Sequence, residues 1–190
     1  MNSIFFITSN NLKFQIAQKA LSGYGIEIIQ KELDTPEIQS KKVEEIASFS
    51  AKWASDLLGE SVIVSDVGYY IEALNGFPGP FIKYINEWLS ADDVLRLMAG
   101  KENRAVIVKD CLAYCEPGKK PVLFCDFAKG SIANKKGSKG KTSINEIFIP
   151  EGYEKTESDI PRDEMKEFWV KSLKHYQLLA EYLRKNNKHI

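Results

Sequence analysis

A short run of small polar residues that ends near a lysine lies between two apolar patterns close to the start of the chain. It comprises Thr8, Ser9 and Asn10, with Lys13 three residues further on. A strand-to-helix turn of this kind can direct backbone N–H groups at an anion, and a lysine adds a positive point charge. We therefore interpret these four residues as candidate phosphate ligands. The alternative is an ordinary Ser or Asn N-cap on the first helix.

Two carboxylates later in the chain are candidate ligands for a metal ion. Asp66 follows an apolar run of buried-strand type, and Glu37 lies in a proline-containing loop. Ligands of open α/β sheets bind at the carboxyl ends of the strands. Mg²⁺ prefers oxygen ligands and keeps several waters while it binds substrate phosphates. We therefore interpret both carboxylates as Mg²⁺ ligands and Asp66 also as the group that activates water. The alternatives are a turn aspartate and a solvated loop glutamate.

Lysines further along the chain offer additional positive charge. Lys83 follows a Gly- and Pro-rich turn at 75–80 and is a candidate second phosphate ligand, the alternative being a solvated helix lysine. The basic run 135–141 has the charge to cover a polyphosphate, but we expect it to form a mobile, soluble loop.

The elements that must position these residues alternate between strands and helices. Strand patterns cover residues 4–7, 26–31, 62–64, 105–114 and 122–132. Helical spacing of apolar residues covers 12–21, 43–58, stretches up to about residue 98, and one last helix through 165–183. Alternating elements together with a paired hairpin predict an α/β fold with a mixed sheet. We expect a single domain over residues 1–190.

Composition excludes several classes of function. The 190 residues include 26 Lys and Arg against 26 Asp and Glu, so no net field attracts nucleic acid or a membrane surface. The first residues become polar too soon for a signal peptide, and no apolar run reaches membrane-spanning length. Cys111, Cys115 and Cys125 lie in apolar stretches without a neighbouring histidine, and we expect three buried, reduced thiols. These features predict a cytoplasmic protein.

Taken in order, these motifs resemble the inosine triphosphate pyrophosphatase family, whose members hydrolyse deaminated purine nucleoside triphosphates. The resemblance implies an elongated mixed sheet flanked by helices, two lobes around a central cleft, dependence on Mg²⁺ and a homodimer. It also implies that Lys13 and Lys83 bind the triphosphate, that Glu37 binds the metal and that Asp66 is the metal-linked base. The matching segments are residues 8–13, 33–37, 64–68, 73–83 and 148–156.

The chain departs from the family pattern at the residues that read the base. Ser65 replaces an acidic residue, and Thr142-Ser143-Ile144-Asn145 replaces Phe-Gly-Trp-Asp. Near the last helix, Met165 replaces a lysine, and Trp169-Val170-Lys171 replaces Ser-His-Arg. By position, Asn145 and Trp169 become candidate base ligands and Lys171 a candidate phosphate ligand, with a core role as the alternative for Trp169. His175 follows one turn later, and we expect it on the helix surface.

The sequence therefore predicts a Mg²⁺-dependent hydrolase of phosphoanhydride bonds that cleaves a nucleoside triphosphate to the monophosphate and pyrophosphate. The substrate is a deaminated purine nucleotide such as ITP, dITP or XTP, or an otherwise altered one. Because the base-reading residues are replaced, we expect a weak or absent preference for inosine and xanthosine. The alternative is a nucleotide-binding protein of the same fold with weakened catalysis.

Overall fold

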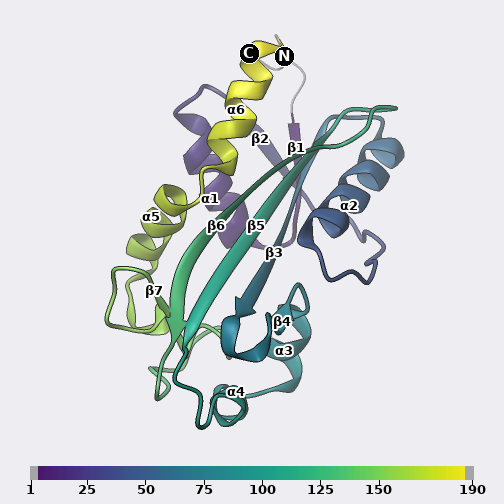
Figure 1. Ribbon diagram of the computed structural model, residues 1–190. Helices are drawn as coiled ribbons and strands as arrows, with labels where there is room; N and C mark the ends of the chain where they lie inside the picture. Colours follow the sequence, from purple (N-terminus) through teal and green to yellow (C-terminus); the bar gives the residue numbers. More distant parts are fainter. Residues whose placement is uncertain (1–3, 187–190) are drawn as a thin grey trace. The chain divides into compact units, whose positions relative to one another are not determined.

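The computed structural model describes residues 4–186 and has a mixed α/β architecture (Figure 1). The strands are β1 (Ile4–Ile7), β2 (Ile28–Lys31), β3 (Val62–Ile71), β4 (Pro78–Gly79), β5 (Ala105–Cys115), β6 (Val122–Ile132) and β7 (Phe148–Pro150). The helices are α1 (Asn11–Ser22), α2 (Val43–Leu58), α3 (Ile82–Trp88), α4 (Ala91–Leu97), α5 (Arg162–Ser172) and α6 (His175–Lys185), with 3-10 turns η1 (Glu72–Leu74) and η2 (Glu157–Asp159).

The strands form one sheet with both parallel and antiparallel pairs. Their order is β2-β1-β3-β5-β6-β7, and β4 pairs with β3. The β1–β2 and β1–β3 pairs are parallel, whereas the β3–β4 and β6–β7 pairs are antiparallel. The predicted α/β fold with a mixed sheet is confirmed.

Two compact units make up the chain. Unit 1 consists of the residues up to Asp66, Asp110–Asp126 and the residues from Trp169 onward. Unit 2 consists of Val67–Lys109 and Phe127–Phe168. The three long strands β3, β5 and β6 each contribute one part to either unit.

Small residues on α2 let this helix pack closely on the strands of unit 1. Ala47, Ala51 and Ala54 are spaced along one helical face and are fully buried. They belong to one apolar cluster with Ile7 and Val62, and the cluster also contains residues of β5. On the other helices of unit 1, α1 contacts α6 (Figure 1). The core of unit 1 therefore fixes β1 and the first half of β3, which lead to the predicted site residues.

Strand β3 is longer than its apolar run predicted. The expected strand ended at Val64, but the structure continues it through Asp66 to Ile71. Val67, Tyr69 and the residues after them have the β-branched or aromatic side chains that strands favour. Asp66 therefore lies within a strand, and the expectation that it follows the strand's end is wrong.

The predicted single last helix is also wrong, because α5 ends at Ser172 and α6 begins at His175. Between them, the backbone N–H of Lys174 donates to Asp126 Oδ2 on β6 at 2.7 Å. A carboxylate thus takes a backbone donor at the point where the chain starts a new helix, which satisfies one of the free N–H groups of that terminus.

The cysteines differ from the predicted reduced set. Cys111 on β5 and Cys125 on β6 form a disulfide, and Cys115 is free and buried. The expectation of three reduced thiols is wrong because β5 and β6 are neighbours in the sheet and place two of them side by side. Cysteine spacing along the chain does not reveal such a cross-strand pairing.

Candidate functional site

The polar turn before α1 is closed by its own side chains. Asn10 Oδ1 accepts the backbone N–H groups of Leu12 at 3.0 Å and Lys13 at 3.3 Å. Thr8 Oγ1 accepts the N–H of Asn10 at 3.1 Å, and Ser9 is exposed. The N-cap interpretation is therefore confirmed for Asn10. Whether the turn also binds phosphate stays a prediction, and any such binding competes with the cap for two of these N–H groups.

Gln30 on β2 fastens the same turn to the sheet. Its Nε2 donates to the carbonyl of Thr8 at 3.1 Å and to Asn11 Oδ1 at 3.2 Å. The sequence interpretation missed this residue. In the sequence, Gln30 is a polar residue that follows two isoleucines in a short strand. This pattern is a weak indication of a functional residue, because exposed faces of strands commonly carry polar side chains.

Lys13 reaches from α1 to β3. Its Nζ donates to the backbone carbonyl of Ser65 at 3.0 Å. Because Ser65 immediately precedes Asp66, a lysine cation lies beside the strand segment that carries the predicted catalytic carboxylate. Asp66 is partly buried, and its Oδ2 atom is shielded from solvent. Among the predicted site residues of unit 1, the structure therefore brings Lys13 close to the strand segment of Asp66.

A buried polar cluster lies behind this segment. Ser65 Oγ donates to Asp110 Oδ1 on β5 at 2.7 Å, and Asp110 Oδ2 is 3.9 Å from His175 Nε2. His175 is fully buried, so the expectation of a surface histidine is wrong. Burial lowers the pKa of His175, while the Asp110 and Asp126 carboxylates act in the opposite direction. Asp110 was missed, although an acidic residue inside an apolar strand was a usable signal.

The other predicted residues of unit 1 lie in different settings. Glu37 is exposed in the irregular segment after β2, and Lys171 is exposed near the end of α5. Trp169 is 7% exposed, which agrees with its core interpretation and leaves little ring surface for a base. Within residues 4–186, no group of three or more His, Cys, Asp or Glu side chains is arranged to hold a metal ion.

Unit 2 contains the remaining two predicted residues, Lys83 on α3 and Asn145 in the segment between β6 and β7. Asn145 Oδ1 accepts the hydroxyl of Thr142 at 2.7 Å, and the carbonyl of Asn145 accepts the N–H of Ser158 at 3.0 Å. These bonds hold the predicted base ligand in one conformation within its own unit.

The segment 133–147, here called the rewritten loop, makes hydrogen bonds to other parts of unit 2. The backbone N–H of Ser138 donates to Asp159 Oδ1 at 3.1 Å, and that of Gly140 donates to Glu146 Oε1 at 3.1 Å. At its far end, the N–H of Ile144 donates to Asn86 Oδ1 on α3 at 3.2 Å. These bonds give parts of the segment partners within unit 2, and the mobility of the basic run 135–141 stays a prediction.

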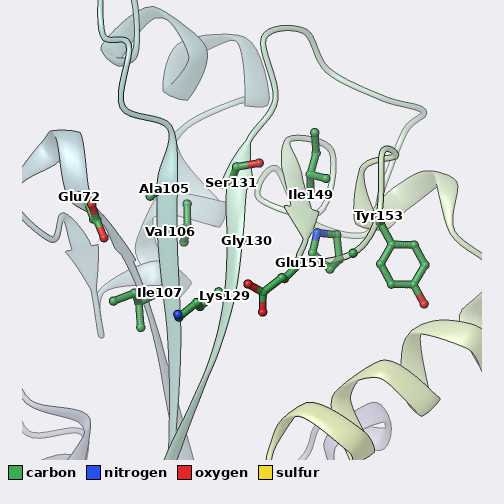
Figure 2. Close-up of a pocket in the computed structure, with 12 residues that line it drawn as sticks. Glu72, Ala105, Val106, Ile107, Lys129, Gly130, Ser131, Ile149, Glu151 and Tyr153 are labelled. Carbon is green, nitrogen blue, oxygen red and sulfur yellow. The ribbon is translucent and has the colours of Figure 1, made fainter.

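Unit 2 also has an open hollow of about 440 Å³ above β5, β6 and the turn after β7 (Figure 2). Glu72, Lys129, Ser131, Glu151 and Tyr153 contribute its polar side chains, and Ile107 is among its apolar ones. Among the described residues, none of the predicted site residues lines this hollow. It gives no support to the sequence-based site.

Comparison with known proteins matches the chain along nearly its whole length. The Ham1 family model matches residues 4–173. The dITP/XTP pyrophosphatase of Methanopyrus kandleri is 40% identical over 161 residues, which are 85% of this chain and 86% of that protein. The inosine triphosphate pyrophosphatase of Tuber melanosporum is 34% identical over 83% of this chain and 85% of that protein.

The solved structures show the same fold at lower identity. A HAM1 protein from Coxiella burnetii has a TM-score of 0.79 at 21% identity, covering 97% of this chain and all of that one. The Ham1 protein of Staphylococcus aureus has a TM-score of 0.76, also at 21% identity. Together with the family model and relatives at up to 40% identity, these matches show that the chain belongs to the Ham1 family.

Proposed function

We propose that this chain is a nucleoside triphosphate pyrophosphatase that hydrolyses deaminated purine nucleotides to the monophosphate and pyrophosphate. The observation that carries the proposal is the Lys13 ammonium, which lies 3.0 Å from the carbonyl of Ser65, directly before Asp66. A cation next to a carboxylate-bearing strand suits the hydrolysis of a polyanion. The names of the relatives, dITP/XTP pyrophosphatase and inosine triphosphate pyrophosphatase, support the same reaction.

In this proposal, Asp66 accepts a proton from the water that attacks the α-phosphorus. Lys13 offsets the phosphate charge, because an ammonium group has three donors and the Ser65 carbonyl takes one of them. Lys83 and Lys171 remain candidate phosphate ligands, as do the polar groups of the turn at 8–10.

The carboxylates of the chain suit a magnesium ion. Mg²⁺ needs only one or two protein carboxylates, because waters and substrate phosphates complete its octahedron. Asp66, with one oxygen shielded from solvent, and the loop residue Glu37 would hold it. When bound, Mg²⁺ would polarise the phosphoryl group and offset its negative charge. The described residues offer no denser group of ligands, which favours this ion over metals that require a complete protein cage.

Two observations point to different conclusions about which base the site accepts. The names of the relatives favour hypoxanthine or xanthine. The rewritten loop instead places Asn145, whose Oδ1 already accepts the Thr142 hydroxyl, where the resemblance implies an aspartate. We propose that the reaction is retained while discrimination against ordinary bases is weaker than about 10⁴-fold, the level that a site with dedicated hydrogen bonds reaches.

The test is pyrophosphate release with Mg²⁺ across natural and deaminated nucleoside triphosphates, with Asp66→Asn as the inactive variant. We expect turnover of at least one nucleotide and its loss in Asp66→Asn, by about 10²- to 10⁴-fold. Asp163→Asn is the matched control, because the Asp163 side chain on α5 is 94% exposed. Full turnover by Asp66→Asn refutes its role. Nucleotide binding without product in the parent chain would favour the non-catalytic alternative.

We also propose a homodimer, supported by the resemblance to the family, and a cytoplasmic location, supported by the balanced charge of the sequence. In the part of the chain that the structure describes, no helix combines the length and the apolar character needed to cross a bilayer. Analytical ultracentrifugation across a concentration series tests the dimer, and a single species at the monomer mass of 21.5 kDa would contradict it.

A further inference from the structure

The backbone carbonyl and the side-chain hydroxyl of Ser65 each form a hydrogen bond with a residue of another element. Its carbonyl accepts Lys13 Nζ at 3.0 Å, and its hydroxyl donates to Asp110 Oδ1 at 2.7 Å. All three residues belong to unit 1, so these contacts do not depend on the arrangement of the two units. Ser65 therefore links a partly buried lysine on α1 to a buried carboxylate on β5.

Asp110 is an unusual residue for its place in the fold. Its strand is otherwise buried and apolar from Cys111 to Cys115, and Asp110 itself is only 8% exposed. A buried carboxylate is costly unless hydrogen bonds compensate it, and a bond from a hydroxyl to an ionised acceptor is among the stronger ones. The Ser65 hydroxyl supplies such a bond.

We propose that Asp110 is a positioning residue for the phosphate end of the site: it holds Ser65, and Ser65 in turn holds the Lys13 ammonium. The proposal rests on the proposed function, in which Lys13 binds phosphate. It also assigns a use to the serine that stands where the family resemblance implies an acid. In this chain, Asp110 on β5 brings a carboxylate into contact with the side chain at that position.

His175 lies next to Asp110 Oδ2, whereas Ser65 contacts Asp110 Oδ1. It is fully buried, and among the described residues neither of its ring nitrogens has a hydrogen-bond partner. Its Nε2 lies 3.9 Å from Asp110 Oδ2, which is too long for a hydrogen bond. A buried imidazole without partners costs stability, so its place beside a carboxylate calls for an explanation. The proposal provides one, because His175 limits the positions open to Asp110.

The experiment compares variants that break the chain of contacts at successive points. Ser65→Ala removes the hydroxyl and leaves the carbonyl that Lys13 contacts, and Asp110→Asn removes the charge at nearly constant volume. Ser65→Thr restores a hydroxyl and serves as the rescue. Ser55→Ala is the matched control, since Ser55 on α2 is fully buried and its hydroxyl donates to the Glu60 carbonyl at 2.7 Å.

Two readouts are measured on the full chain. The first is the affinity for inorganic pyrophosphate with Mg²⁺ by calorimetry, and the second is kcat and KM for the best nucleotide. We expect Ser65→Ala and Asp110→Asn each to lower kcat by about 10- to 100-fold, as displaced site groups do. Pyrophosphate should bind several-fold more weakly to both, while Ser55→Ala matches the parent and Ser65→Thr recovers most of the loss.

Coupling separates positioning from a general loss of structure. If the residues act through one another, adding Lys13→Met to Ser65→Ala or to Asp110→Asn lowers pyrophosphate affinity little further than Lys13→Met alone. Additive losses, or equal losses in Ser55→Ala, overturn the proposal. The binding readout needs no turnover, so a chain that hydrolyses no nucleotide refutes the proposed function while the coupling among these residues still tests the positioning role.

Discussion

The polar turn with β3 in unit 1 and the rewritten loop in unit 2 both carry candidate ligands, but they are held in different ways. In unit 1, Lys13 and Ser65 are fixed by a backbone carbonyl and by the buried carboxylate of Asp110. In unit 2, the loop is held by the exposed carboxylate of Asp159, by Glu146 and by the amide oxygen of Asn86. Exposed hydrogen bonds contribute less than buried ones, since water competes for the same groups.

This difference predicts how substitutions in each region affect the activity. A change at the buried edge leaves a charged or polar group unsatisfied inside the protein, so phosphate binding and chemistry should suffer together. A change in the rewritten loop disturbs the exposed bond to Asp159 or the side chain that we predict to read the base. We therefore expect substitutions in unit 1 to affect all substrates equally and substitutions in the loop to affect the choice among them.

Among the substitutions that test this comparison of unit 1 with the rewritten loop, Lys13→Met should have the largest effect, through phosphate binding. The methionine keeps most of the side-chain length and removes the charge, so kcat/KM should fall by about 10- to 100-fold for every nucleotide, the range of a charged hydrogen bond. Lys19→Met is the control, because Lys19 is exposed on the same helix. A loss confined to one base, or an equal loss in the control, would contradict a phosphate role.

Gly137→Ala should break the rewritten loop without touching unit 1. A Cβ at Gly137 would overlap Thr156 Oγ1 and Asp159 Oδ2, so the loop must shift. We expect a loss of stability of about 1–3 kcal/mol, typical of overpacking, which lowers the melting temperature by roughly 2–4 °C per kcal/mol. Gly23→Ala is the control, because its Cβ meets no atom within 4 Å and its φ is −62°. Equal melting temperatures for the two variants would refute this prediction.

The sequence predicted the features that depend on neighbours along the chain. The helix start at Asn10 follows from residue types within four positions, and the structure has that cap. By contrast, the contact between Ser65 and Asp110 joins residues 45 positions apart, and the burial of His175 depends on strands that precede it. Local patterns cannot specify such contacts, because pairing and burial are decided when the elements pack together.

Asn145→Ala should change the selectivity among nucleotide bases without changing phosphate binding. If Asn145 reads the base, its removal should change the ratio of kcat/KM between any two bases by up to about tenfold, the value of one neutral hydrogen bond. The affinity for inorganic pyrophosphate should stay the same, because this probe has no base. Ser143→Ala, which removes the donor to Asn86 Oδ1 in the same segment, is the control. An unchanged ratio across the nucleotide panel would remove Asn145 from the base site.

The smallest effect concerns the acid sensitivity of the rewritten loop. Hydrogen bonds from Ser138, through its hydroxyl and its backbone N–H, and from the Thr156 hydroxyl lower the pKa of Asp159 below its usual value. A carboxyl whose pKa is lower in the folded state stabilises the protein above its unfolded pKa of about 3.9, and this contribution disappears as the pH falls through the folded value.

Asp159→Asn should therefore melt below the parent chain at neutral pH, and the difference should shrink as the pH falls below about 4. Melting curves from pH 7 to pH 2.5 measure this, with Ser138→Ala expected to reproduce part of it because one donor of the carboxylate remains on the backbone. A difference that stays constant with pH would mean that Asp159 holds the loop through its shape and not through its charge. The loop would then be anchored by the shape of its side chains, and the contrast of an exposed carboxylate in unit 2 with the buried Asp110 carboxylate in unit 1 would no longer hold.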